Sequence, residues 1–346
     1  MEIIVKTIID EIDIKEWSDF VSTHPKGSVF QTPQMFRCYE RTPGQTPFIV
    51  GAYQNTKLVG ILVAVIIREK GFLKSRFSSR SIITSGPIVR NDDARILEIL
   101  LREYDDAVGR QVIYTQIRNQ YEQLSNCDVF RNHGYRFEPH LNYLIWLDSE
   151  ENIWGRIGNG RTKHIKTAQK NGLYVDVYGP GALKLAPQQL HEGFDVILEV
   201  YRRAGLPLVD CAQIEAANEE GLLRMFVVRT KDGEMAGCRF GLSFGKSLYG
   251  WYAGSRSRYY SLFPNDLLIW ETLRWASANG YEVFDYGGAG SPNKAYGVRC
   301  FKSQIGGELI DPGRWEKVHK LLKMYIGRLG YALYRYCKKM TNKLSR

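Results

Sequence analysis

The chain has 346 residues, of which 44% are hydrophobic and 24% charged, a composition that favours two globular domains and excludes a disordered chain. Its formal net charge of +10 favours a polyanionic partner, such as nucleic acid, a phosphorylated substrate or an anionic membrane face. The six cysteines form no C-x-x-C pair and have no histidine cluster beside them in the sequence, which predicts neither a zinc site nor a disulfide framework.

The first half begins with Met1–Lys6, which is strand-like and lacks the basic start and long apolar stretch of a signal peptide. A helix from Trp17 to His24 follows, and then a hairpin over 48–62. The longest apolar run, Leu58–Ile67, is only long enough for a strand. A further strand is predicted over 112–117, after a second helix. These features predict a soluble or membrane-peripheral protein in the cytoplasm.

The second half repeats this order of elements. A helix is predicted over 194–205, and a hairpin over 225–240 turns at Asp232-Gly233. Pro264 and Gly280 bound a helix with an apolar stripe at helical spacing. A strand over 282–286 then closes the sequence of elements.

The two halves are related by a constant interval in the sequence. The same number of residues separates Trp17 from Phe194 and Gly60 from Gly237. We therefore predict an α+β fold in which one unit is used twice, although chance similarity between two ordinary segments is the alternative. Polar residues 148–152 mark a boundary, which predicts domains over 1–150 and 151–315 and a basic amphipathic helical tail over 316–346. Ligands often bind where two domains meet, so we expect a cleft between them.

A basic segment follows the predicted boundary. Residues 161–170 are rich in lysine and arginine and predict a short helix that ends at Asn171-Gly172. Ile165 and Ala168 would face inward, whereas Arg161, Lys163 and Lys170 would face outward. Fixed positive charge at a helix start suits a phosphate or carboxylate, and a solvated charged face is the alternative.

A glycine-rich run near the end of the chain contains a lysine. Gly287-Gly288 and Gly306-Gly307 flank Lys302, and glycines let the backbone approach a ligand closely. A lysine beside backbone N–H donors predicts a place where an oxyanion is stabilised. The alternative is a glycine-rich turn with a solvated lysine.

These segments resemble a known family. In order along the chain they are similar to motifs of FemAB-type peptidyltransferases, which add amino acids to peptidoglycan precursors. The segments are Phe30–Met35, Ser85–Ile88, 161–175, Trp275–Gly288 and Phe301–Gly307. The resemblance runs from about residue 28 to 316. It implies two acetyltransferase-like (GNAT-like) domains in tandem, in agreement with the repeat.

The resemblance also implies roles for single residues. Lys302 would stabilise the tetrahedral intermediate that forms when a substrate amine attacks the ester of an aminoacyl-tRNA. Tyr252 would line the cleft, and Phe301 precedes Lys302 in the matching motif. Arg37 on the first-domain helix would meet the substrate's phosphates. Arg161 and Lys163 would add substrate-binding charge.

The sequence departs from the family at two places. The arginine and tyrosine that usually follow the long second-domain helix are absent from Leu206–Glu215. There is also no room for a long helical arm between Gly172 and Phe194. The muramyl-peptide acceptor of the family therefore does not transfer to this chain by resemblance.

The chemistry expected of the site needs neither a metal nor an organic cofactor. Ser255–Pro264 occupies the place of a pyrophosphate-binding loop but contains no glycine, which disfavours acetyl-CoA. An aminoacyl-tRNA or another acyl carrier would be the cosubstrate. An ester is already reactive, so positioning and charge stabilisation carry most of the task. Asp285 would hold the incoming ammonium or accept its proton, unless it only caps the next turn.

Three functions remain open from the sequence. The first is an aminoacyltransferase acting on an amine of a nucleotide- or lipid-linked cell-envelope precursor. The second is an N-acyltransferase that modifies an amino sugar of an envelope polysaccharide. The third is a non-catalytic protein that binds tRNA or a membrane. The basic tail over 316–346 would lie on the inner face of the membrane, face nucleic acid or pack on the second domain.

Overall fold

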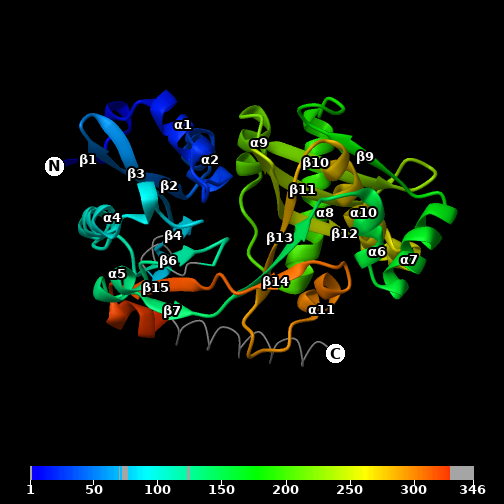
Figure 1. Ribbon diagram of the computed structural model, residues 1–346. Helices are drawn as coiled ribbons and strands as arrows, with labels where there is room; N and C mark the ends of the chain where they lie inside the picture. The colour runs from blue at the N-terminus through cyan, green and yellow to red at the C-terminus, as the bar shows by residue number, and fades with distance from the viewer. Residues whose placement is uncertain (1, 70, 72–76, 123–124, 328–346) are drawn as a thin grey trace.

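The computed structural model describes residues 2–69, 71, 77–122 and 125–327. These residues form two mixed sheets side by side, each covered by helices (Figure 1). The first sheet has the order β1-β2-β3-β4-β6-β15-β7, and β5 pairs with β3. Its strands are β1 (Ile3–Lys6), β2 (Gln45–Gln54), β3 (Lys57–Ile67), β4 (Arg80–Thr84), β5 (Ile88–Val89), β6 (Tyr114–Arg118), β7 (Arg136–Glu138) and β15 (Arg314–Val318).

The second sheet has the order β14-β8-β13-β12-β11-β10-β9. Its strands are β8 (Leu141–Trp146), β9 (Tyr174–Tyr178), β10 (Leu223–Arg229), β11 (Met235–Phe244), β12 (Ser247–Ser255), β13 (Val283–Gly290) and β14 (Glu308–Ile310). Reversing this order aligns it with the first sheet strand by strand. The two parallel pairs, β4 with β6 and β12 with β13, then fall at the same place. This correspondence confirms that one α+β unit is used twice, as the sequence predicted.

Helices pack on both sheets. They are α1 (Ile14–Thr23), α2 (Pro33–Glu40), α4 (Ala94–Val108), α5 (Cys127–Asn132), α6 (Glu150–Arg156), α7 (Asn159–Lys170), α8 (Pro187–Ala204), α9 (Cys211–Glu219), α10 (Pro264–Ala278) and α11 (Gly297–Ser303). Short 3-10 turns are η1 (Ile9–Glu11), η2 (Val29–Gln31), η3 (Arg90–Asp92) and η4 (Ser257–Leu262). The helix predicted from Phe194 begins earlier, at Pro187, because proline fits the first helical turn.

Local sequence explains where many elements end. The β2–β3 hairpin turns on Asn55 and Thr56, which both have positive φ as a two-residue hairpin turn requires. Gly205 takes the left-handed conformation that ends α8. The predicted basic helix is α7, which ends at Asn171 with Gly172 at positive φ. Ile165 and Ala168 on this helix are buried, as predicted.

Two strands cross the boundaries that the sequence suggested. The predicted first domain included residues 141–146, yet β8 pairs with β13 and β14 of the second sheet. The predicted tail began at 316, yet residues 314–318 form β15 between β6 and β7 of the first sheet. Figure 1 shows β15 (orange-red) beside β6 and β7. Each unit thus donates one strand to the equivalent position of the other sheet.

The buried side chains explain why this exchange is stable. Alternate β8 residues Leu141, Tyr143 and Ile145 are buried in the second core. Trp315 of β15 is 1% exposed, and its ring stacks on Phe130 of the first core. Polar residues at 148–152 mark the end of a strand and not the end of a sheet, because strand partners are set by hydrogen bonds between distant segments.

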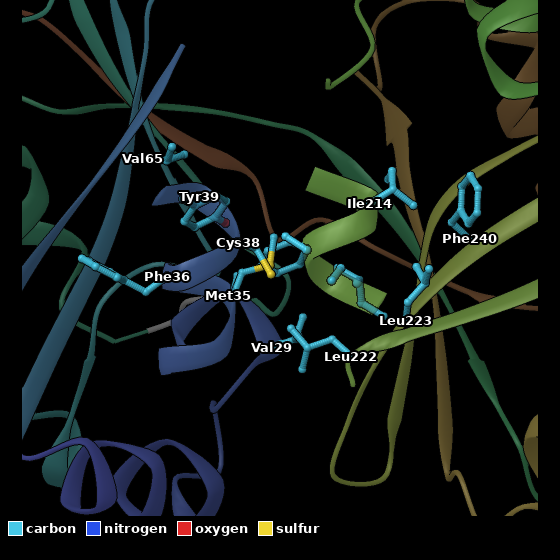
Figure 2. Close-up of a cluster of buried hydrophobic side chains, with 14 of the residues drawn as sticks. Val29, Met35, Phe36, Cys38, Tyr39, Val65, Ile214, Leu222, Leu223 and Phe240 are labelled. Carbon is cyan, nitrogen blue, oxygen red and sulfur yellow. The ribbon is translucent and has the colours of Figure 1, made fainter. Parts of the chain in front are cut away.

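A third core lies between the two units. Figure 2 shows Met35 and Cys38 of α2 facing Leu222 and Leu223, which lead into and begin β10. Ile214 of α9 joins the same buried cluster. This apolar contact fixes the two sheets relative to each other and frames the cleft between them.

The predicted helical tail is described only in part. Residues 321–327 are helical, and residues 328–346 lie outside the described residues. Among the helices that the structure describes, none has both the length and the apolar character needed to cross a bilayer.

Candidate functional site

Two adjacent cavities lie between the sheets and share the side chains of Gln120 and Tyr249. The first, of about 240 Å³, contains Arg118 and Arg314 and is called the arginine cavity. The second, of about 270 Å³, contains Asp285 and is called the aspartate cavity. The arginine cavity is also lined by Phe30, Thr84, Asn119, His140, Leu141, Asn142, Trp251, Tyr252, Gly287, Gly288 and Pro312. Residues from both units line each cavity.

Asp285 lies on β13 at the wall of the aspartate cavity, and its side chain is buried. Its carboxylate accepts hydrogen bonds from the Asn142 amide at 3.0 Å and the Gly287 backbone N–H at 2.8 Å. The Gln120 amide of the first unit lies at 3.4 Å. Burial raises the pKa of Asp285 to about 6, although these hydrogen bonds favour the ionised form. The carboxylate can therefore exchange a proton near neutral pH.

The turn-capping role that was the alternative for Asp285 is also present. Its bond to the Gly287 N–H closes a bulge in β13, where the register with β8 shifts. Gly287 has φ +75, a conformation that favours glycine. The same residue thus shapes the strand and offers a carboxylate to the cavity.

Lys302 on α11 lies next to this bulge. Its ammonium donates to the backbone carbonyls of Tyr286, Gly287 and Gly288 at 2.5, 2.8 and 3.0 Å. Burial lowers its pKa to about 7, and the charge of Asp285 opposes that change. All three ammonium donors are thus engaged, and Lys302 lines neither cavity. The ammonium thus contacts the backbone here, and its contact with an oxyanion stays a prediction.

Arg118 and Arg314 are direct cross-strand neighbours on β6 and β15. Burial in the cleft lowers the pKa of Arg118. Burial, and then the charge of Arg118, lower the pKa of Arg314 to about 10. Burial and these two charges also lower the pKa of His140 to about 4, so its ring is neutral at pH 7. The arginine cavity is therefore cationic through its guanidinium groups alone.

Aromatic side chains form the second-unit side of the arginine cavity. Tyr252, predicted to line the cleft, is one of them, and burial raises its pKa. Its ring lies 5.1 Å from that of Trp251. Tyr249 meets Phe30 of the first unit edge to face at 5.0 Å. These rings provide flat apolar surface beside the two arginines.

The structure places the other predicted binding residues in contacts away from the two cavities. Arg37 forms a two-point ion pair with Glu220 across the interface, at 2.9 and 2.5 Å. Arg161 does not point freely outward, because it bonds Gln304 at 2.7 Å and lies over the ring of Phe301. Lys163 is exposed on the outer side of α7.

The start of α10, where a GNAT-type pyrophosphate loop would lie, is filled by side chains. Asp266 is buried in its first turn and is bonded by Arg161 at 3.1 Å. The ring of His164 stacks on Phe263, the residue before the helix, at 4.0 Å. A carboxylate in the first turn satisfies the helix dipole and repels phosphate. At the equivalent start of α4, Asp93 accepts from the backbone of Arg95 at 2.8 Å.

Sequence reasoning missed Arg118, Arg314, His140 and Asn142. Arg118 ends a predicted strand, and Arg314 was placed at the far end of the other domain. Nothing in their local sequence joins them, because the pairing of β6 with β15 alone brings them together. Asn142 lies on β8, the other exchanged strand.

One cluster outside the cleft has ligand-type side chains. His191 on α8 and Cys211 and Glu215 on α9 have donor atoms within 4.8 Å of one another. His191 and Glu215 already form a hydrogen bond of 2.6 Å. This pairing satisfies both groups without a metal.

Comparison with known proteins places this geometry in context. Residues 211–296 match the family of acetyltransferase (GNAT) domains. No protein with a curated description matches the chain. These residues are thus similar to GNAT acyltransferase domains, and the predicted enzyme class, an acyltransferase, is confirmed at that level.

Solved structures are similar over nearly the whole chain. The structure of FemX is 13% identical, with a TM-score of 0.72, over 94% of this chain and 100% of that one. A tandem GNAT protein from the clavulanic acid biosynthesis pathway is 9% identical, with a TM-score of 0.60, over 92% and 99%. L-PGS from Bacillus licheniformis is 14% identical, with a TM-score of 0.57, over 85% and 91%. At these identities the likeness concerns the fold, and it confirms the predicted resemblance to FemAB-type proteins at that level.

Proposed function

We propose that this protein is an aminoacyltransferase that moves an amino acid from an aminoacyl-tRNA to an amine of a cell-envelope precursor. The observation that carries the proposal is the buried carboxylate of Asp285, which lines the aspartate cavity beside the arginine cavity and has a pKa of about 6. A transfer between two large substrates needs two approaches to one reacting centre. The adjacent cavities, which share Gln120 and Tyr249, supply them.

The reaction follows from these positions. The acceptor amine attacks the ester carbonyl of the donor, and a C–N bond forms as the carbonyl oxygen becomes an oxyanion. Asp285 takes a proton from the attacking nitrogen. The C–O bond to the tRNA ribose then breaks, and the proton passes to the leaving oxygen. Atoms and charge balance without an oxidant or a metal.

Lys302 has two roles in the proposed reaction: it positions the backbone beside the arginine cavity, and it supplies a positive charge. Its bonds to the carbonyls of Gly287 and Gly288 fix the backbone that lines the arginine cavity. The carbonyl and the N–H of a trans peptide point in opposite directions. The two peptides whose carbonyls accept from Lys302 therefore direct their N–H groups away from Lys302. Together with the buried ammonium, this backbone would stabilise the oxyanion.

We infer the identity of the acyl donor from the side chains at the start of α10. The buried Asp266 and the stacked His164 and Phe263 occupy the position where acetyl-CoA would place its pyrophosphate. This arrangement disfavours a coenzyme A thioester. The likeness to FemX and L-PGS supports the proposed class. Such a reaction belongs on the cytoplasmic side, where charged tRNA is present.

The second candidate is an N-acyltransferase acting on an amino sugar. The match of residues 211–296 to acetyltransferase (GNAT) domains favours it. It keeps Asp285 as the base and changes the acyl carrier and the acceptor.

One experiment separates the candidates. The purified full-length protein is incubated with radiolabelled aminoacyl-tRNA or acetyl-CoA and a panel of amines: nucleotide-linked muramyl peptides, lipid-linked precursors and amino sugars. We expect label to move from tRNA to a precursor amine. Transfer from acetyl-CoA alone would replace the proposal by the second candidate, and no transfer from either donor would leave a binding protein.

A further inference from the structure

The exchange of strands creates a pair of like charges. Arg118 ends β6 of the first unit, and Arg314 begins β15, which follows the second unit in the chain. The two residues are directly opposite in the ladder, although 195 positions separate them in sequence. Like charges directly opposite on neighbouring strands destabilise a sheet. The presence of such a destabilising pair in the cleft therefore indicates a functional role for the two charges.

Neither guanidinium has a carboxylate at ion-pair distance among the described residues, although the charges of Glu138 and Glu316 act on Arg314. Among the same residues, Arg314 makes no side-chain hydrogen bond. Arg118 gives its Nε to the Gln116 side chain at 2.8 Å, which leaves its terminal nitrogens for another acceptor. Arg118 is exposed and Arg314 is half-buried, and no carboxylate is among the described residues that line their cavity, so the two guanidinium groups are accessible to an anion.

The surroundings restrict the chemistry of that anion. A phosphate offers several oxygens, and two planar guanidinium forks can each bind it at two points. Trp251 and Tyr252 add a flat aromatic surface to the same cavity. Asn119 also lines it, and its buried Oδ1, which has no hydrogen-bond partner among the described residues, can accept from the edge of a base. An anion attached to a flat heterocycle matches all of these groups.

We propose that the arginine cavity binds a phosphate group of a nucleotide, held between the guanidiniums of Arg118 and Arg314 with the ring system against Trp251. This inference rests on the proposed function, because the tRNA donor ends in a nucleotide and a nucleotide-linked acceptor carries a second one. The terminal adenosine of a tRNA and the diphosphate of a nucleotide-linked acceptor share the chemistry. The experiment must therefore distinguish these two sources.

Binding is measured by calorimetry on the full-length protein with AMP, which represents the donor end, and UDP, which represents the acceptor. We expect at least one of them to bind. Arg118→Gln and Arg314→Gln should each weaken that binding about tenfold or more, because a hydrogen bond to a charged group is lost. Arg314→Lys should keep part of the affinity through its charge. Arg95→Gln, an exposed arginine on α4, is the matched control and should bind as the unchanged protein does.

Two further measurements keep the test decisive. Without ligand, Arg314→Gln should melt at the same or a higher temperature than the unchanged protein, because a like-charge contact is removed. Trp251→Leu should weaken nucleotide binding more than binding of inorganic phosphate. The proposal is overturned if neither nucleotide binds, or if both glutamine variants bind as well as the Arg95→Gln control.

The binding experiment can succeed or fail independently of the transfer assay, because nucleotide binding needs no turnover. If the protein transfers amino acids from tRNA and the arginine variants bind and react normally, the subsite is wrong and the function stands. If nucleotide binding depends on the arginine pair but no transfer from tRNA is found, the subsite stands and the aminoacyltransferase function is wrong.

Discussion

The carboxylate of Asp285 on β13 accepts a 3.0 Å hydrogen bond from the side-chain amide of Asn142 on β8, a strand that precedes the second unit in the chain. The exchanged strand thus holds the group proposed as the base. Because Asn142 and Gly287 both donate to the same oxygen, the carboxylate orientation is fixed. Preorganisation of this kind is what acid–base catalysis requires.

Replacing Asp285 with asparagine should lower kcat by about a hundredfold or more, since the proton acceptor is lost while the shape is kept. In the unchanged protein, kcat should rise as the pH passes upward through about 6, where the carboxyl ionises. Single-turnover rates across pH, with the asparagine variant as control, measure both effects. A pH profile that is the same in the two proteins would contradict the assignment.

The Asp285→Asn variant should lose activity but keep or gain stability. The folded protein holds the Asp285 proton up to about pH 6, whereas an unfolded aspartate loses it near 4. Between these values the folded state binds more protons, so this carboxyl makes stability rise as pH falls. At pH 7 its ionised form costs about 3 kcal/mol, at about 1.4 kcal/mol for each pKa unit. Asp285→Asn should therefore unfold at an equal or higher denaturant concentration at pH 7.

Lys302→Met should lower kcat by about 10² to 10³, because the backbone beside the arginine cavity loses its anchor and the site loses a charge. Substrate affinity should change little. The folded-state pKa of about 7 lies below the ordinary 10.5, so the unfolded chain binds this proton more tightly between those values. Lysine 302 thus makes stability rise with pH in that window, and the methionine variant should lack this slope in denaturation measured against pH. Transfer at an unaltered rate would show that Lys302 has no part in the reaction.

The ion pair between Arg37 and Glu220 predicts a modest effect on stability and none on catalysis. The Arg37 side chain is 41% exposed, so solvent screens the pair, and we expect a coupling of about 0.5 to 1 kcal/mol. A double-mutant cycle with Arg37→Gln and Glu220→Gln, measured by urea denaturation at low and high salt, tests this. A large loss of substrate affinity in Arg37→Gln alone would instead support the phosphate contact suggested by family resemblance.

Replacement of Trp315 tests whether the exchanged strand β15 is part of the first core. Trp315→Ala should cost about 3 to 5 kcal/mol, because a fully buried indole stacked on Phe130 is removed from the first core. Leu309→Ala on β14, where the side chain is 47% exposed, is the control and should change stability by less than about 0.5 kcal/mol. Chemical denaturation followed by circular dichroism compares the two. Equal stability of the two variants would place β15 outside the core.

Much of the fold follows from local signals. Asn55-Thr56, Gly172 and Gly205 mark turns and helix ends because their backbone conformations restrict which residues fit. The interval between Gly60 and Gly237 indicated the duplication for a similar reason. Both lie in hairpin strands, where an added Cβ would collide with Ile96 of α4 at Gly60 and with Ser255 of β12 at Gly237.

The sequence predicted only those site residues that belong to a motif within one segment of the chain. Asp285 and Tyr252 belong to motifs of the second unit and lie in the cleft. The arginine pair depends on the register between two strands from opposite ends of the sequence, and hydrophobic patterning does not encode that register. Arg37 and Arg161 carry charges suited to a ligand, but the folded chain provides Glu220 and Asp266 as their partners.

The crossing of β8 and β15 also constrains how the chain is made. Domains of a nascent chain ordinarily fold one after another as they leave the ribosome. Here the amino-terminal sheet lacks an interior strand until residues 314–318 have been translated, and its β6 and β7 edges stay open until then. The earliest part of the protein to be synthesised is thus among the last to finish folding, and during translation its exposed edges are where a chaperone would be needed.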